Sequence, residues 1–388
     1  MKSVRDVNIA GKTVIIRCDF NVPMQNFEIV DDARIVKALP TIEYCLSQNA
    51  KVILMSHLGK VKKKEDLVNT LIPVAKYLSC LLDRNVSFIK DNEDRTVPAS
   101  IASLKPGDVV LLENTRFADL IKQRESSNDS KLAEFWASLG DIFVFDAFGA
   151  AHRDHASTSG IMQFLPTIVG DLVNKELVAL SLLESPKKPF IAIMGGAKID
   201  DKILLIKKLL SNVDYLLVGG GIALPFLKAH GYSVDYNNEE HISLCKILLE
   251  QFNEKIIIPQ DVLVKVDNEY QFVVAKKLNN QAIVDIGPFT NQLFADYISK
   301  AKTVLWNGPM GIIEVSESAR GTTELLTDLS VTKADVIIGG GDSGVLIKQL
   351  GIEDKFYHVS TGGGATLTYI EQGTLPVIEK IKNQVHKI

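Results

Sequence analysis

The sequence is poor in cysteine and has neither a long apolar run nor a strong net charge. Its four cysteines, spread over 388 residues, form no C-x-x-C pair, which argues against a disulfide framework or a zinc site and favours thiols in a reducing compartment. No segment approaches the roughly 20 apolar residues that span a bilayer, and the first residues do not resemble a secretory signal. A net charge of −4 provides no positive field for nucleic acid. We therefore expect a cytoplasmic protein that binds neither membrane nor nucleic acid.

Several familiar catalytic motifs are also missing. No G-x-x-x-x-G-K-[ST] string occurs, which excludes an ordinary P-loop enzyme. The strings at 146–149 and 152–154 resemble protein-kinase motifs, but they stand in reversed order and no Gly-rich loop precedes them. His152 and His155 have no adjacent Glu, so we do not expect them to bind zinc.

Apolar runs suited to central strands of a parallel sheet alternate with stretches of helical period, which predicts an α/β fold. The length favours two domains, given a prior of roughly 150 residues per domain. In the first half, the expected strands are 13–17, 51–55, 109–113 and 141–145, and the expected helices are 31–49, 65–82 and 130–140.

A helix expected at 170–190 ends in Ser-Pro-Lys-Lys-Pro, and the strand rhythm restarts after it. We place the domain boundary in this stretch, with an N-terminal domain of 1–172 completed by 375–388 and a C-terminal domain of 173–374. Each domain is expected to be a doubly wound, Rossmann-like parallel sheet, and a hinge joins them, with 185–189 and the final helix as hinge candidates. Further parallel strands are expected at 190–194, 214–218, 255–258, 282–286, 302–306 and 335–339, with a hairpin at 262–276.

Four strand-like runs in the second half end in glycine clusters. Glycine lets backbone N–H groups turn toward a ligand, and a following helix N-terminus adds partial positive charge. One cluster alone is weak evidence, because many strand-to-helix turns need a glycine, but four clusters predict a polyphosphate ligand. The clusters are at 191–198, 215–221, 335–344 and 356–365.

Polar residues accompany these clusters. Lys198 follows the first cluster directly and Lys202 stands one helical turn further on, so both ammonium groups can neutralise phosphate at that loop. Asp342 and Ser343 suit a Mg²⁺ shell and a phosphate contact. The alternative for Asp342 is a helix N-cap; the two roles could coexist, and we favour the metal. Gly339, Gly341 and Gly344 also match the dinucleotide fingerprint, but no acidic residue follows at the distance that would hold a ribose.

The first half has single basic residues near predicted strand ends instead of glycine clusters. Arginine recognises carboxylate and phosphate with two parallel hydrogen bonds, so these residues predict a second anion site for a small, doubly anionic substrate. The basic residues are Arg17, Arg34, His57, Arg116, His152 and Arg153.

Ten ordered strings make the whole chain resemble the phosphoglycerate kinase family. They are RCDFNVP, DDARIVKALPTI, SHLGK, LLENTRF, DAFGAAHRDHAS, AIMGGAKIDDKI, GGGIA, TVLWNGPMGIIE, GGGDS and STGGGA.

This resemblance implies a phosphotransferase with a carboxyl group as acceptor, which transfers phosphoryl reversibly between 1,3-bisphosphoglycerate and ADP to give 3-phosphoglycerate and ATP. It implies a monomer, with the triose acid on the N-terminal domain and the Mg²⁺-nucleotide on the C-terminal one. Asp19 and Asn21 would bind the hydroxyl and carboxyl end of the acid, and Arg34 would act at the reacting centre. The acid's phosphate would be held by His57, Arg116 and Arg153.

On the other domain, the resemblance implies that Lys198 and the amides of Gly362 and Gly363 receive the transferring phosphoryl group. Lys202 and Asp342 would serve the nucleotide phosphates, with Asp342 also binding the metal, and Glu314 would contact the ribose. The remaining nucleotide-binding residues would be Gly196, Gly220, Asn307, Pro309, Gly341 and Ser343.

Several positions depart from the pattern of the family, among them Lys60, Asp154, Pro225 and Phe289, and the strings at 258–261 and 311–314 are also altered. None of them removes a reacting group, but Asp154 beside Arg153 could weaken substrate affinity. Two rival functions remain at this stage. The fingerprint at 339–344 motivates a nicotinamide dehydrogenase, and a non-catalytic nucleotide-binding protein could share the fold.

Overall fold

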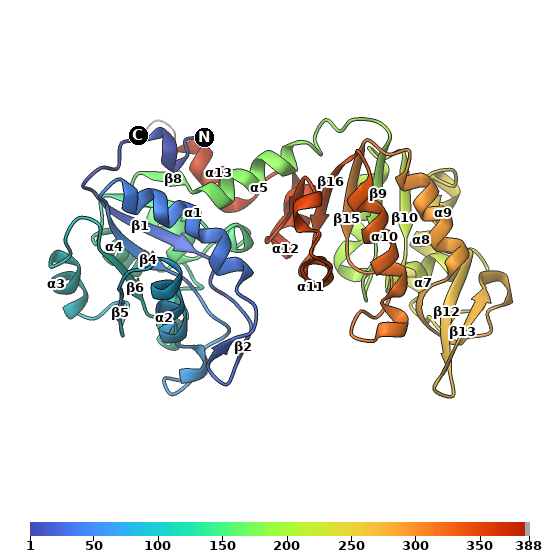
Figure 1. Ribbon diagram of the computed structural model, residues 1–388, viewed down its shortest axis with the longest axis horizontal. Helices are drawn as coiled ribbons and strands as arrows, with labels where there is room; N and C mark the ends of the chain where they lie inside the picture. Colours follow the sequence, from blue (N-terminus) through green and yellow to red (C-terminus); the bar gives the residue numbers. More distant parts are fainter. Residues whose placement is uncertain (385–388) are drawn as a thin grey trace. The chain divides into compact units, whose positions relative to one another are not determined.

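The computed structural model describes residues 1–384, without the side chains of Asp201 and Asp342, and it divides into two compact units. The first contains Met1–Val178 together with the chain from Gln372 onward, and the second contains Ala179–Glu371. The division, between Val178 and Ala179, falls inside helix α5 (Asp171–Ser181). The boundary expected from the sequence, 172/173, lies earlier in the same helix. Helix α13 (Pro376–Asn383) packs in the first unit, where the Val377 N–H donates to the Ala151 carbonyl at 3.3 Å (Figure 1).

The first unit is built on a six-stranded sheet in the order β5-β6-β4-β1-β7-β8, and every neighbouring pair is parallel. The four central strands were expected from the sequence because they are apolar on both faces. The two edge strands, β5 and β8, were missed, since they are short and one of them contains a serine. The strands are β1 (Thr13–Cys18), β4 (Lys51–Met55), β5 (Val86–Ile89), β6 (Val109–Leu112), β7 (Ile142–Asp146) and β8 (Thr167–Val169).

Helices cover this sheet with the apolar faces that the sequence pattern indicated. The helix expected at 65–82 was placed too early, because α2 begins only at Ile72. Pro73 stands in the first turn of α2 and not in its middle. A backbone N–H in the first turn has no partner within the helix, so proline costs no hydrogen bond there. The helices are α1 (Ala33–Ser47), α2 (Ile72–Leu81), α3 (Thr96–Ala102) and α4 (Ser130–Ala137), in addition to α5 and α13; a short hairpin, β2 (Met24–Gln25) and β3 (Glu28–Ile29), precedes α1.

The second unit has its own six-stranded parallel sheet, in the order β11-β10-β9-β15-β16-β17. The expected α/β class with two doubly wound parallel sheets is therefore confirmed. The strands are β9 (Phe190–Met194), β10 (Tyr215–Val218), β11 (Ile256–Ile257), β15 (Thr303–Asn307), β16 (Asp335–Gly339) and β17 (His358–Val359). The helices are α6 (Ile203–Leu210), α7 (Gly220–Ala229), α8 (Glu239–Gln251), α9 (Pro288–Ile298), α10 (Arg320–Val331), α11 (Gly341–Leu350) and α12 (Gly364–Gln372).

One strand of this unit was assigned to the wrong sheet. The run at 282–286 forms β14 (Ala282–Ile286), which pairs antiparallel with β12 (Asp261–Val266) in a separate three-stranded sheet. The expected hairpin is confirmed, with β13 (Glu269–Val274) as its second strand and Asp267 and Asn268 at φ +48° and +67° in its turn. An apolar run of five residues fits either sheet, so its pattern alone could not decide between them.

Across residues 1–384, no helix has both the length and the apolar character needed to cross a membrane. In open α/β sheets, ligands bind beyond the carboxyl ends of the strands. The loops at these ends therefore define where each unit can hold a ligand.

Candidate functional site

The basic residues of the first unit gather beyond the carboxyl ends of β1, β4, β6 and β7. Arg34, in the first turn of α1, places its Nη1 3.0 Å from Asp19 Oδ2 and 3.3 Å from the Asn21 carbonyl. The Asn21 side chain accepts the Gly59 N–H at 2.8 Å, which fixes it between the β1 and β4 loops. Burial opposes ionisation of Asp19, yet Arg34 beside it holds the pKa of this carboxyl below its usual value. The structure thus joins the three residues expected at the carboxyl end of the acid.

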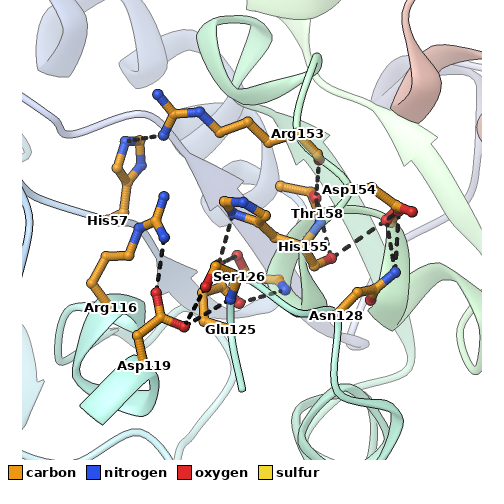
Figure 2. Close-up of polar contacts among 12 residues, drawn as sticks. His57, Arg116, Asp119, Glu125, Ser126, Asn128, Arg153, Asp154, His155 and Thr158 are labelled. Atoms are coloured by element: carbon orange, nitrogen blue, oxygen red, sulfur yellow. Dashed lines mark hydrogen bonds and ion pairs between the residues drawn. The ribbon is translucent and has the colours of Figure 1, made fainter. Parts of the chain in front are cut away.

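His57 lies between two guanidinium groups. Its Nδ1 is 3.3 Å from Arg17 Nη2, and its Nε2 is 3.4 Å from Arg153 Nη1; Figure 2 shows the second contact. Burial, reinforced by these arginines and by Arg116, lowers the pKa of His57 to about 3, so its ring is neutral at pH 7. A neutral imidazole accepts a hydrogen bond at only one ring nitrogen. One of the two guanidinium groups therefore finds no acceptor at His57 and is available to an anion.

Arg116 borders the same cluster from the loop after β6. Its Nη1 donates to Asp119 Oδ2 at 2.8 Å (Figure 2), and its buried Nε has no hydrogen-bond partner among the described residues. Arg153 has no carboxylate partner among the described residues, and its Nε donates to His152 Nε2 at 3.2 Å. His57, Arg116 and Arg153, the three residues expected to hold the acid's phosphate, thus share one cluster with donors to spare.

Arg17 belongs to this cluster although the resemblance gave it no role. It is 1% exposed, its Nε donates to Ser157 Oγ at 2.9 Å, and its Nη1 donates to the Cys18 carbonyl. The signal that could have identified it was a charged residue inside an otherwise apolar central strand. Glu125 and Ser157, which stand behind Arg17, had no such signal, because they meet it only through the fold.

In the second unit, the glycine loops after β9 and β10 pack against each other. The Gly221 N–H donates to the Gly196 carbonyl at 2.7 Å, and a Cβ on Gly221 would lie 2.1 Å from the Ala197 carbonyl oxygen. Gly196 has φ +105°, in the region where residues with side chains are strained. Only glycine lets these two backbones approach so closely, and the result is a surface of main-chain groups.

These loops border a cavity of about 270 Å³, whose lining includes the predicted residues Gly196, Gly220, Pro309 and Glu314. Nearby, at the carboxyl end of β15, Asn307 is 1% exposed, and its Nδ2 has no hydrogen-bond partner within residues 1–384. Because an unpaired buried donor is costly, it marks a place where a ligand acceptor belongs.

The remaining predicted nucleotide residues lie around the same sheet edge. Lys202 donates through Nζ to the Gly195 carbonyl at 2.7 Å, whereas Lys198 is exposed. Gly341 opens α11; the side chain of Asp342 lies outside the described residues. The Ser343 hydroxyl is buried and accepts from Trp306 Nε1 at 3.0 Å, so it faces the core of the unit.

The loop between β17 and α12 contains the two glycines expected at the transferring phosphoryl group. The Gly362 N–H donates to Ser360 Oγ at 3.0 Å, and it is therefore engaged within the loop. Gly363 has φ +51°, and a Cβ there would meet no atom within 4 Å. Among the described residues, those of this loop included, no group of three His, Cys, Asp or Glu residues is placed to hold a metal.

The residues that depart from the family pattern make their described contacts with residues other than the reacting groups of their own units. Asp154 pairs with Lys380 of α13 at 2.6 Å. It also accepts from Asn128 at 3.1 Å, a contact that Figure 2 shows. Lys60 is exposed, Pro225 lies inside α7, and Phe289 is 77% exposed at the start of α9.

Comparison with known proteins matches nearly the whole chain to one family. The family model described as phosphoglycerate kinase matches residues 4–373. A phosphoglycerate kinase of Macrococcus caseolyticus (strain JCSC5402) is 46% identical over 393 residues, and one of Staphylococcus aureus (strain bovine RF122 / ET3-1) is 47% identical over 393 residues, with 99% of each chain covered in both cases.

Solved structures give the same result. The chain is similar to phosphoglycerate kinase from Coxiella burnetii, with a TM-score of 0.87, 37% identity and coverage of 98% of this chain and 99% of the other. Its similarity to phosphoglycerate kinase from Pyrococcus horikoshii OT3 has a TM-score of 0.90, with 33% identity and full coverage of both chains. The chain belongs to the phosphoglycerate kinase family.

Proposed function

We propose that this chain catalyses reversible phosphoryl transfer between 1,3-bisphosphoglycerate and ADP, which yields 3-phosphoglycerate and ATP in glycolysis and gluconeogenesis. The observation that carries the proposal is that one chain of this family has two clusters of groups suited to anions, and that the two are of different kinds. The first unit has a cluster of arginines around His57. The second has a glycine-lined cavity and, at the end of β15, a buried Asn307 amide with no partner among the described residues.

In the first unit, the proposal gives the triose acid two anchoring points. Asp19 and Asn21, which position Arg34, would receive the hydroxyl and carboxyl end. Arg116, Arg153 and neutral His57 would bind the phosphate, and the spare guanidinium donors support this assignment. Charge-assisted hydrogen bonds from several fixed donors are the strongest non-covalent contacts available to such a ligand.

In the second unit, the nucleotide would lie in the cavity beside Gly196, Gly220 and Pro309, with Glu314 at the ribose. The Asn307 amide, Lys202 and the first turn of α11 would face its phosphates. Gly341 and Ser343 would contribute through their backbone N–H groups, because the Ser343 hydroxyl faces the core. The exposed ammonium of Lys198 and the Gly362–Gly363 loop would receive the phosphoryl group. Because Gly362 already donates to Ser360, the amide of Gly363 is the better donor of the two.

The chemistry requires charge neutralisation more than proton transfer. In the ATP-consuming direction, a carboxylate oxygen of the acid forms a bond to the γ-phosphorus, and the bond from that phosphorus to the bridging oxygen breaks, leaving its electron pair on ADP. The carboxylate is already ionised at pH 7, so no general base is needed. Catalysis then depends on aligning two anions and stabilising the charge on the transferring group. Arg34, Lys198 and backbone amides are suited to this task.

Magnesium is the cofactor that this function implies. The residues fit a metal that arrives on the nucleotide phosphates. The cavity is bordered by glycines that leave room for a polyphosphate, and the buried Nδ2 of Asn307, next to Gly339 and Gly340, has no partner among the described residues. Asp342 would be its carboxylate contact. When bound, Mg²⁺ neutralises phosphate charge during the transfer.

The wider setting of this function is also proposed. We infer that the protein works as a cytoplasmic monomer and that the two units act as domains on a hinge that includes residues 185–189. An acyl phosphate is labile to water, so units that open to load and close to react would protect it.

A coupled assay tests the proposal. The protein should release ADP from Mg-ATP only when 3-phosphoglycerate is added, and NADH titration should give no change in absorbance or fluorescence. Equal ADP release without the acid would contradict the assignment.

A further inference from the structure

Glu125 is a fully buried carboxylate behind the arginine cluster, and neither the motifs nor the proposed mechanism gives it a task. It follows η3 (Thr115–Leu120), outside every helix and strand of the first unit. Its Oε2 accepts the Ser157 N–H at 2.9 Å, and its Oε1 accepts the Ser157 Oγ–H at 2.5 Å. The Ser157 hydroxyl is therefore fixed in one direction, with its proton toward Glu125.

The fixed hydroxyl orients Arg17. With its proton committed to Glu125, Ser157 Oγ accepts from Arg17 Nε at 2.9 Å, and Arg17 Nη2 then reaches His57 Nδ1 at 3.3 Å. A continuous chain of contacts thus runs from Glu125 through Ser157 and Arg17 to His57. The contacts of Ser157 with Glu125 and with Arg17 have ordinary hydrogen-bond distances, whereas the contact between Arg17 and His57 is longer.

The charges of the cluster give Glu125 a second task. Arg34 pairs with Asp19 and Arg116 with Asp119, both at a few ångströms, whereas Arg17 has no carboxylate in direct contact among the described residues. Burial lowers the pKa of the Arg17 guanidinium, and Glu125 is the negative charge that opposes this shift most, ahead of Asp19. Burial also raises the pKa of Glu125, with Arg17 and Ser157 opposing the rise. His155 Nδ1, 3.8 Å from Oε1, also faces this carboxylate (Figure 2).

We propose that Glu125 is the resident counter-charge of the phosphate-binding cluster and, through Ser157, a positioning residue for Arg17. In the free protein it offsets the repulsion among Arg17, Arg116 and Arg153. When the substrate's phosphate binds, the same negative charge opposes the ligand. The carboxylate therefore exchanges some anion affinity for stability of the empty site. This inference rests on the proposed function only in taking the acid's phosphate as the natural ligand.

The two tasks predict opposite effects for two neighbouring substitutions. Glu125→Gln removes the charge and keeps the size, so inorganic phosphate and 3-phosphoglycerate should bind about threefold or more tightly. Ser157→Ala keeps the charge but removes the acceptor of Arg17 Nε, so both anions should bind about threefold or more weakly. Glu134→Gln, an exposed position on α4 of the same unit, is the matched control and should change neither affinity.

The experiment measures anion affinity by calorimetry and melting temperature with and without inorganic phosphate, on the full chain. For Glu125→Gln, we expect a lower melting temperature without phosphate and a larger rise on adding it than for the unmodified protein, because tighter binding stabilises more. A Glu125→Gln protein that folds only when phosphate is present would be the extreme form of the same result. Weaker or unchanged anion binding by Glu125→Gln would overturn the counter-charge role, and unchanged binding by Ser157→Ala would overturn the positioning role.

If Glu125→Gln folds neither with nor without phosphate, the counter-charge role is tested with Glu125→Asp instead. It keeps the charge but shortens the side chain, so anion binding should not become tighter; tighter binding would contradict the proposal. Since phosphate binding is measured without turnover, failure here is distinct from failure of the proposed enzyme activity. That activity is judged by ADP release that depends on 3-phosphoglycerate.

Discussion

The two units have the same architecture but build their anion sites by different means. The first unit uses charged side chains, and most of its guanidinium groups have a carboxylate or an imidazole beside them. The second unit uses main-chain groups brought together by glycines, with a neutral buried amide at Asn307. Charged side chains need counter-charges when the site is empty, whereas backbone dipoles do not. The first site should therefore be sensitive to charge, and the second to the addition of a single Cβ atom.

The largest effect is expected from the one cation in each unit assigned to the reacting group. Arg34→Ala and Lys198→Ala should each lower turnover by about 1,000-fold, because each removes a positive charge that stabilises the transferring phosphoryl group. Steady-state kinetics with circular dichroism measures the loss and checks the fold. Arg320→Ala and Lys208→Ala, at exposed positions of the second unit, are the controls. Retention of a tenth of the activity by either active-site variant would refute its assigned role.

A methyl group should damage only the second site. Gly221→Ala would place its Cβ 2.1 Å from the Ala197 carbonyl oxygen, so the β9 and β10 loops must separate. We expect Mg-ADP affinity to fall about 100-fold, with 3-phosphoglycerate affinity unchanged, in separate calorimetric titrations.

The control for this change is Gly344→Ala, on α11, where a Cβ would meet no atom within 4 Å. Normal nucleotide binding by Gly221→Ala would show that the backbone cradle does not hold the nucleotide.

A buried carboxyl group in the second unit should give stability a pH dependence. Burial raises the pKa of Asp285 to about 7, although it accepts N–H groups from Gly321 and Ile286. Since the folded protein keeps this proton to higher pH than the unfolded chain, the stability that it contributes is present at low pH and declines as pH rises from about 4 to about 7.

Asp285→Asn should remove that decline, which is on the order of a few kcal/mol. Urea unfolding measures this decline as the difference between the free energies of unfolding at pH 5 and at pH 8. Asp146, whose pKa burial also raises to about 7, provides the same dependence in the first unit, so its decline should persist in the variant. An identical pH dependence in variant and unmodified protein would contradict the assignment.

The smallest effect is expected at Asp154, the departure next to Arg153. Its pair with Lys380 is about half exposed on both sides, and such pairs contribute about 1 kcal/mol or less. Asp154→Ala should change the KM for 3-phosphoglycerate by less than about twofold, because Lys380 and Asn128 already engage the carboxylate. A KM that falls tenfold would show that Asp154 does weaken substrate binding.

Much of the fold followed from local patterns, because central parallel strands are buried on both faces and read as apolar runs. Residues 51–55 and 190–194 were assigned to within a residue for this reason. Residues 282–286 were assigned to the wrong sheet, since their partners lie elsewhere in the chain. The site divides in the same way. Short sequence strings were enough to predict Arg34 and the glycine loops as site residues. The contact of Arg17 with Ser157 joins residues 140 apart in the sequence, so it depends on the fold.

Hydrogen exchange on the full chain tests the central claim most directly, with 3-phosphoglycerate and Mg-ADP added in separate experiments. The acid alone should slow exchange in the loops that carry Asn21, His57 and Arg153, and Mg-ADP alone should slow it at 195–198, 219–221 and 309–314. Protection of the glycine loops by the acid, with the arginine loops protected by Mg-ADP, would contradict the assignment of the two sites.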